Sequence, residues 1–378
     1  MIRRPAAALA WLLMLGVALA CARPAGSPSS GAAPATAAPA SDGGRGETGA
    51  SPAQSGAAAA PARAEAAPVA TSGPREAIVF GIPQRNLNYI VPMAAKALGY
   101  FEQEGLDVDI RELQSNLTIA ALQRGDMQIS GSGGSALRAA VQGAPFKLIS
   151  FMTVRPTFYL VTVPSVQAPA QLVGKRIGVN NVASSQQNFA EIYARESSVD
   201  PGEIIFMGMG PNPASAIAAI QAGALDGAVL DPASVAVAEA QGLRTLKALG
   251  EVAPQPLQGL VTTEDYLAQR PAVVRAFLKG LVRGLLYTKE HTREVAAVAQ
   301  QELGLDLDEG MAQRAVALYA DTISAEAPGY ADAKLLDAFY HYDIRVPLNI
   351  PDDQPLPVLH DFRYLLEAYD ALNLPRPR

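Results

Sequence analysis

Short apolar runs alternate with longer amphipathic segments from residue 77 onward. The first run, 77–82, ends in a Gly-Ile-Pro turn and predicts a buried strand. The segment 89–104 repeats apolar residues at helical spacing and stops at Gly105, which predicts a helix. The same alternation then predicts the strands 108–110, 128–130 and 146–152 and the helices 117–124 and 135–142. Strands separated by helices of this length predict a parallel sheet with right-handed crossovers.

The alternation continues in the second half of the chain. It predicts the strands 176–179, 204–206 and 227–230, the helices 187–196, 214–221 and 234–241, and a long helix beginning at Pro271. Two segments, 121–130 and 219–228, share the order helix, glycine stop and short strand. A generic repeated α/β unit would give this similarity, and so would one unit in each of two similar lobes. We favour the second interpretation, which predicts an α/β fold of two lobes, each a parallel or mixed sheet flanked by helices.

The N-terminus has the pattern of a secretory signal. Two arginines precede an apolar run, 6–20, that is short for a transmembrane helix. Residues 18–21 (ALAC) resemble a bacterial lipobox, which predicts a signal peptide over 1–20 and lipidation of Cys21. Ordinary cleavage beside an incidental cysteine is the alternative. Residues 21–75 are mainly Ala, Pro, Ser and Gly, a composition that predicts a disordered tether.

Composition and charge exclude several classes of function. The net charge is −6 and no basic stripe occurs, so the sequence predicts no nucleic-acid binding. Cys21 is the single cysteine, so the folded part has no disulfide, thiolate metal site or cysteine nucleophile. The three histidines, His291, His341 and His360, lack metal-ligand spacing, and no Gly-x-Ser-x-Gly elbow occurs. We therefore predict no catalytic residue, no metal site and no cofactor, and expect a protein that is not an enzyme.

Four stretches, in order, resemble the solute-binding proteins of the importers for sulfonates, nitrate, taurine and thiamine-pyrimidine precursors. They are 99–108 (GYFEQEGLDV), 169–179 (PAQLVGKRIGV), 218–226 (AAIQAGALD) and 267–278 (LAQRPAVVRAFL). The resemblance implies a two-lobed periplasmic-binding-protein-like fold of type II, in which chain returning from the second lobe completes the first. We expect residues 76–163 plus 256–378 in lobe 1 and residues 164–255 in lobe 2.

The resemblance also implies a function. It predicts a monomer that captures a small molecule between its lobes and delivers it to an ABC importer permease. The lipid on Cys21 would hold it at the cell membrane, facing the periplasm or the cell exterior. An enzyme of cofactor biosynthesis on the same fold is one alternative, and a periplasmic sensor or partner-binding subunit is another.

Ligands of open α/β sheets bind beyond the carboxyl ends of the strands, which selects the candidate loops. Asn86 follows the first strand, in a turn that could equally be only solvated. Gly131, Ser132 and Gly133 precede a helix, where free backbone N–H groups can hold an anion or a carbonyl. The alternative for that loop is a flexible turn in which Ser135 caps the helix.

The second lobe supplies the other candidates. Asn181, Ser184 and Ser185 bring amide and hydroxyl groups to the start of a helix, where capping competes with ligand contact. Asp231 follows a buried strand and could accept from a ligand amine or merely cap the next helix. Tyr159 could stack on a planar ligand. Because basic residues suited to sulfonate or nitrate are not evident, we favour a small planar or amide-bearing organic ligand.

Overall fold

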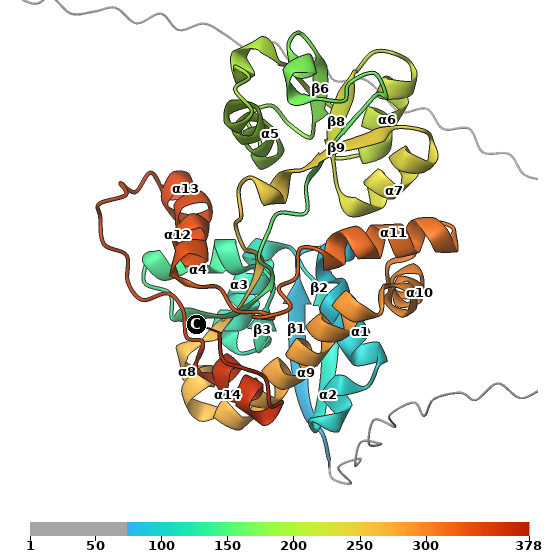
Figure 1. Cartoon of the computed structure of the whole chain (residues 1–378). Helices are drawn as coiled ribbons and strands as arrows, with labels where there is room; N and C mark the ends of the chain where they lie inside the picture. The colour runs from blue at the N-terminus through green and yellow to red at the C-terminus, as the bar shows by residue number, and fades with distance from the viewer. Residues whose placement is uncertain (1–73, 378) are drawn as a thin grey trace, which may run out of the picture. The chain divides into compact units, whose positions relative to one another are not determined.

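The computed structural model describes residues 74–377, which form two five-stranded sheets with flanking helices (Figure 1). This arrangement confirms the predicted two-lobed α/β fold. The predicted signal peptide, Cys21 and nearly all of the predicted tether lie outside the described residues. No helix among residues 74–377 combines the length and the apolar character that a membrane span requires.

The first sheet combines the start of the folded chain with a strand from its later part. Its order is β2 (Leu106–Glu112), β1 (Glu76–Ile82), β3 (Ile129–Ser130), β10 (Leu257–Thr263) and β4 (Phe146–Thr153). β1 pairs in parallel with β2 and β3, whereas β10 runs antiparallel between β3 and β4. Since β10 arrives after the whole second sheet, the chain crosses between the sheets twice.

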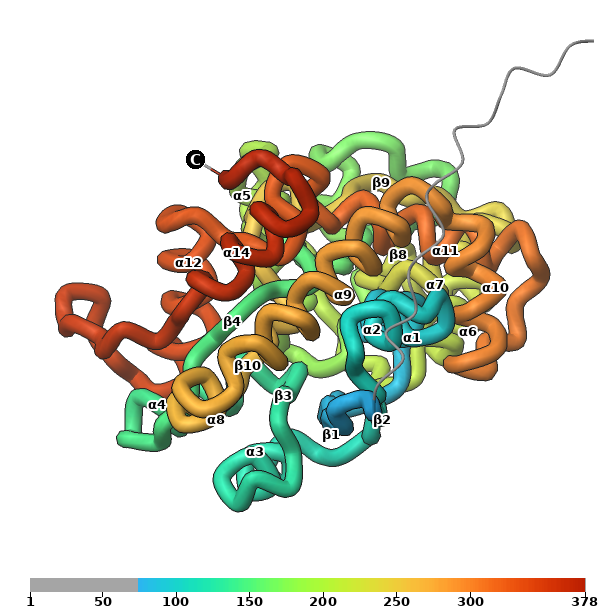
Figure 2. Tube along the Cα trace, turned by 90° about the horizontal axis from the view of Figure 1, so that it is seen from below, coloured from blue at the N-terminus to red at the C-terminus, as the bar shows by residue number. Residues whose placement is uncertain are grey.

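Helices from both ends of the described chain belong to this half, some packed on the sheet and others on neighbouring helices. They are α1 (Ile90–Ala97), α2 (Tyr100–Gln103), α3 (Ser115–Arg124), α4 (Gly133–Val141), α8 (Glu264–Gln269), α9 (Pro271–Glu290), α10 (Thr292–Leu303), α11 (Glu309–Ala320), α12 (Ala333–Phe339), α13 (Val346–Leu348) and α14 (Arg363–Ala371). Figure 2 shows α9 between α14 on one side and α1 and α2 on the other. The ring of Phe277 on α9 stacks on Phe101 at 5.1 Å and lies 5.7 Å from Phe80. The long helix predicted from Pro271 is therefore the central apolar element of this half.

One predicted helix is interrupted. The sequence predicts a single helix over 89–104, whereas the structure has α1 and α2 on either side of Gly99. Gly99 has φ of 71°, a left-handed conformation that ends a helix and that glycine adopts without a steric penalty. Apolar residues keep their helical spacing across Gly99, so the periodicity of the sequence alone does not indicate the interruption.

The second sheet has the order β7 (Ile205–Gly208), β6 (Arg176–Val179), β8 (Gly227–Leu230), β5 (Tyr159–Thr162) and β9 (Arg244–Ala248). Its helices are α5 (Ser185–Glu196), α6 (Pro213–Gln221) and α7 (Pro232–Ala240). β6 is parallel to β7 and β8, and β5 is antiparallel to β8 and β9. The sequence grouped β5 with lobe 1, but hydrogen bonding places it in the second sheet. The chain therefore passes from the first sheet to the second before Tyr159. The exact boundaries of the two lobes stay a prediction.

Helix α11 connects the two halves. Leu318 of α11 is buried in an apolar cluster that includes Tyr159 and Val235 from the second half. On the same helix, the Arg314 guanidinium lies 2.8 Å from a carboxylate oxygen of Glu239 on α7. The contact is therefore both apolar and ionic, and the end of α11 lies beside the first chain crossing, where the Val154 N–H donates to the Thr322 carbonyl at 3.0 Å.

Candidate functional site

A cavity of about 750 Å³ is lined by residues from both halves of the described chain. Ser184 and Ser185 at the start of α5 and Glu191 in its middle line one side, and His341, Tyr342 and Asp343 line the opposite side. Its volume falls within the roughly 300–1,000 Å³ of small-molecule sites. A cavity walled by two separately folded sheets is the expected place for a ligand that binds between lobes.

The start of α5 forms one wall of this cavity and contains a buried hydroxyl group. Two glutamine side chains hold the preceding loop, since Gln186 accepts from the Asn180 N–H and Gln187 accepts from the Ala183 N–H, both at 2.8 Å. Ser184 occupies the N-cap position, but its side chain makes no capping hydrogen bond. Its Oγ is buried and has no hydrogen-bond partner among the described residues. A buried hydroxyl without a partner is uncommon in native proteins and marks a place where a ligand or water group would be accepted.

The opposite wall comes from a short π-helix, η5 (Tyr340–Arg345), which follows α12. Single π-turns within helices occur frequently at functional sites. Asp343 projects from η5, and its Oδ2 accepts a hydrogen bond from Gln255 Nε2 at 2.6 Å. Burial raises the pKa of Asp343 to about 6, while the Gln255 hydrogen bond and the Arg138 charge act in the opposite direction. Burial is therefore the main reason that the pKa of this carboxyl group exceeds that of an exposed aspartate.

Aromatic rings complete the cavity. Phe158 and Phe189 line it from the second half, with ring centroids 5.7 Å apart. His341 and Tyr342 pack edge to face at 4.8 Å on the other side. The cavity thus combines apolar ring surface with a few polar groups, as small-molecule sites generally do.

Of the nine ligand contacts predicted from sequence, Ser184 and Ser185 line the large cavity. Asn181 is exposed in the loop just before them. Asn86 accepts from the Asn88 N–H at 3.1 Å and so caps a turn. Tyr159 is buried, its hydroxyl donates to the Leu318 carbonyl at 2.7 Å, and it lines a different cavity beside α11, so its stacking on a ligand stays a prediction.

The glycine loop at 131–133 is packed tightly. The Tyr89 hydroxyl donates to the Gly131 carbonyl at 3.1 Å. A Cβ on Gly133 would lie 2.5 Å from the Gly259 carbonyl oxygen, so this glycine permits the close approach of α4 to β10. Ser132 is buried, and its Oγ has no partner among the described residues. Close packing accounts for the two glycines, and ligand contact at this loop stays a prediction.

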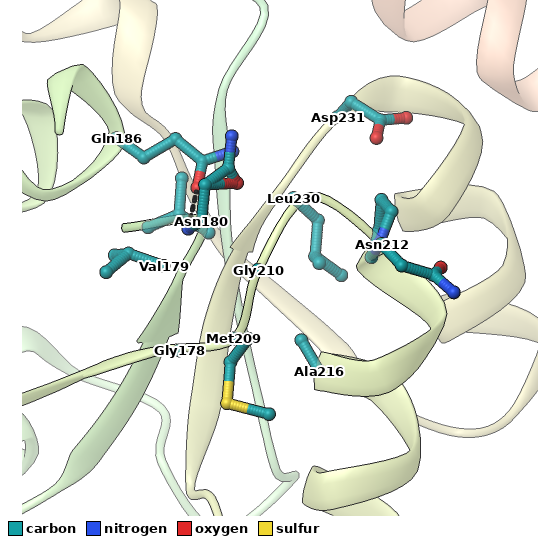
Figure 3. A pocket seen from close by; sticks show the side chains of 12 residues that line it. Gly178, Val179, Asn180, Gln186, Met209, Gly210, Asn212, Ala216, Leu230 and Asp231 are labelled. Carbon is teal, nitrogen blue, oxygen red and sulfur yellow. Dashed lines mark hydrogen bonds between the residues drawn. The ribbon is translucent and has the colours of Figure 1, made fainter. Parts of the chain in front are cut away.

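A smaller hollow lies at the carboxyl edge of the second sheet (Figure 3). Asn180, Gln186 and Asp231 are among its lining residues, and its volume is about 20 Å³. That is room for about one water molecule. Asp231 accepts from the N–H of Ser234 at 3.1 Å and from its hydroxyl at 2.9 Å. Figure 3 shows its carboxylate turned away from Asn180 and Gln186, so the geometry favours the capping role of Asp231.

Replacing Asp231 by alanine is expected to lower the free energy of unfolding by about 1 kcal/mol, because α7 loses its N-cap. Replacement by serine keeps a capping oxygen and should restore most of that loss. Urea denaturation followed by circular dichroism measures both changes. Unchanged stability of the alanine variant together with weakened ligand binding would return Asp231 to the binding site.

The sequence of residues 86–295, more than half of the chain, matches the model of the NMT1/THI5-like family. The chain belongs to the NMT1/THI5-like family. No protein of curated function matches it in sequence. The family match confirms the resemblance that four short stretches of the sequence indicated.

Solved structures show the same fold for this NMT1/THI5-like chain. The periplasmic aliphatic sulphonate binding protein SsuA from Escherichia coli is 17% identical, with a TM-score of 0.57 over 75% of this chain and 96% of its own. The periplasmic nitrate-binding protein NrtA from Synechocystis PCC 6803 is 12% identical, with a TM-score of 0.53 over 80% and 90%. The desulfurization enzyme DSZB is 14% identical, with a TM-score of 0.57 over 79% and 100%. The fold is that of periplasmic binding proteins, and an enzyme also uses it.

Sequence reasoning missed most of the large cavity of this NMT1/THI5-like protein. The sequence predicted none of Gln255, Tyr342, Phe189, Glu191 and Asp343 as a ligand contact, and His341 was considered only as a metal ligand. Among the described residues, no group of three or more potential ligand side chains could hold a metal ion. The available signal was a polar pair at 341 and 343 in an otherwise amphipathic helical region. Only the folded structure shows that this region faces α5.

Proposed function

We propose that this chain is a lipid-anchored extracytoplasmic solute-binding protein that captures a small organic molecule between its lobes and delivers it to an ABC importer permease. The observation that carries the proposal is the cavity of about 750 Å³ with walls from both halves of the chain. Family membership and the binding-protein fold of SsuA and NrtA support it. The two chain crossings, at 154–158 and 252–256, allow closure on the ligand with few backbone changes.

Capture without catalysis is the second part of the proposal. DSZB shares the fold, and its C27S mutant has been solved in complex with biphenyl-2-sulfinic acid. The present chain has its one cysteine at position 21, outside the part of the structure that forms the cavity. A bound molecule recovered chemically unchanged after prolonged incubation, as measured by mass spectrometry, is the expected result. Conversion of that molecule would favour the enzyme alternative.

Ligand binding is expected to stabilise the protein and to make it more compact. A thermal-shift screen of nitrogen heterocycles, sulfonates and carboxylates would identify a ligand, since binding to the native state alone adds about 2.7 kcal/mol at a hundredfold excess over Kd. Small-angle scattering should then show a smaller radius of gyration on binding. Ser185→Trp should block the cavity, whereas Ser165→Trp, at an exposed turn, should bind normally. Equal binding by both variants would contradict this site.

The anchor is expected to depend on Cys21. In cells, a fatty-acid probe should label the wild-type protein and not the Cys21→Ser variant, because the lipobox cysteine is the lipidated residue. Immunoblotting of the membrane and soluble fractions supplies the control for expression. Equal labelling of the two proteins would remove the anchor from the proposal and leave solute binding intact.

A further inference from the structure

The wall of the large cavity is acidic and aromatic. Glu191 and Asp343 carry carboxylates, and the described residues that line the cavity include no lysine or arginine. A desolvated anion in such a cavity would meet carboxylates in the wall, while the nearest arginines, Arg138 and Arg195, lie outside the lining, which is unfavourable. Ring faces and carboxylates both attract cations. The composition of the wall therefore favours a ligand of positive charge.

The two carboxylates are not equivalent. Glu191 already has a cation, since Arg195 Nη2 lies 2.8 Å from its Oε2, and Gln187 donates to its Oε1 at 2.7 Å. Asp343 has only the neutral amide of Gln255 on its Oδ2. Within the described residues, no hydrogen bond or ion pair reaches its Oδ1. Asp343 is therefore the carboxylate left to meet a charge from outside the protein.

The nearby arginine does not neutralise Asp343. Arg138 of α4 donates from Nη1 to the Asp343 backbone carbonyl at 2.7 Å and from Nη2 to the Ser135 hydroxyl at 3.0 Å. Those contacts hold its guanidinium on the backbone side of η5, and it forms no ion pair with the carboxylate among the described residues. Oδ1 lies beside Gly134, where an added Cβ would be 3.0 Å away. Backbone contacts thus fix the position of Asp343, and its Oδ1 can still accept a hydrogen bond from a ligand.

We propose that the cavity binds a small organic cation, a protonated nitrogen base whose N–H groups donate to Asp343 Oδ1. The apolar part of the molecule packs against Phe158 and Phe189. The buried Ser184 hydroxyl on the opposite wall takes a hydrogen bond from, or donates one to, a polar group at the far end. This inference rests on the proposed solute-binding function and adds the chemical class of the solute. The proposed ligand is a cation, whereas the sulphonate and nitrate named for SsuA and NrtA are anions.

Binding of such a cation depends on pH in a defined direction. The charged and titratable groups around Asp343 are Arg138 on α4, His341 on η5 and Glu191 across the cavity on α5. Because burial raises the pKa of Asp343 to about 6, the carboxyl group is largely protonated at pH 5 and ionised at pH 7. A cation beside it favours the ionised form and lowers that pKa. Affinity should rise from pH 5 to pH 7, and binding at pH 6 should release a proton.

Isothermal titration calorimetry of the full chain tests the inference with matched probe sets. Each set holds one framework constant, for example benzylamine, benzyl alcohol and benzenesulfonate, with propyl and cyclohexyl sets beside it. The cationic member should bind at least about tenfold more tightly than the alcohol, and the sulfonate should bind least. Titration at pH 6 in buffers of different ionisation enthalpy should show proton release for the cation alone.

Variants assign the effect to one residue. Asp343→Asn should weaken binding of the cation at least about tenfold and abolish the proton release. Asp353→Asn removes the same charge from an exposed loop and should change neither. Tightest binding of the sulfonate or alcohol, or an unchanged Asp343→Asn variant, would overturn the cation assignment while leaving solute binding in place. Failure of every probe, together with failure of the broader thermal-shift screen, would count against the proposed function itself.

Discussion

Replacing Phe277 by alanine is expected to lower the free energy of unfolding by about 3–5 kcal/mol. Phe277 is fully buried in α9, where it stacks on Phe101 and lies beside Phe80 of β1. The substitution removes the apolar contact of a whole ring and leaves a cavity that neighbouring rings fill only in part. Because α9 packs on α1, α2 and α14, the loss affects the core of the first half directly.

Urea denaturation followed by circular dichroism measures this change, with calorimetry to test whether the two halves unfold together. Phe277→Leu keeps most of the apolar volume and should cost less than half as much. Leu117→Ala, at an exposed position of α3, should change stability by no more than about 0.5 kcal/mol. A loss below about 1 kcal/mol for the Phe277→Ala variant would show that α9 is not the centre of this core.

Gly133→Ala is expected to destabilise the fold by about 2–3 kcal/mol. The added methyl group would lie 2.5 Å from the Gly259 carbonyl oxygen and 2.8 Å from the Gly259 carbonyl carbon, both on the backbone of β10. Backbone in the middle of a sheet cannot rotate aside as a flexible side chain can, so α4 and β10 must separate. A role in ligand contact alone predicts the reverse, with normal stability and altered affinity.

The matched control is Gly310→Ala in the first turn of α11. An added Cβ there meets only a side-chain oxygen of Asp308 at 3.4 Å, which is ordinary contact. Since alanine has the higher helix propensity, this variant should be unchanged or more stable by up to about 1 kcal/mol. Equilibrium unfolding of the two variants side by side gives the comparison. Opposite signs support the packing role of Gly133, whereas equal stabilities would restore it as a ligand contact.

Local periodicity was sufficient to predict most of the elements. The strand predicted at 77–82 corresponds to β1 and the helix predicted at 187–196 to α5, because each carries its own apolar pattern. The helix predicted over 89–104 is interrupted because a backbone conformation at Gly99 leaves the apolar spacing intact. β9 was not predicted, since its residues are only partly buried and carry no alternation strong enough to distinguish a strand.

The candidate site, like the fold, was predictable from the sequence only in part. The hydroxyl-rich start of α5 was predicted because a helix N-terminus after a buried strand is a local feature of the sequence. Asp231 was predicted with two possible roles, and the cap geometry favours one of them.

The sequence by itself determined the α/β class, the family and the polar loop at Ser184 and Ser185, because each depends on residues close together in the chain. Only the tertiary structure decided that η5, more than 150 residues later, faces that loop and brings Asp343 into the same cavity. It also decided that Gly133 packs against Gly259, because that residue lies on a strand that returns from the other half. Contacts between distant segments depend on how whole sheets and helices pack, and no local pattern records them.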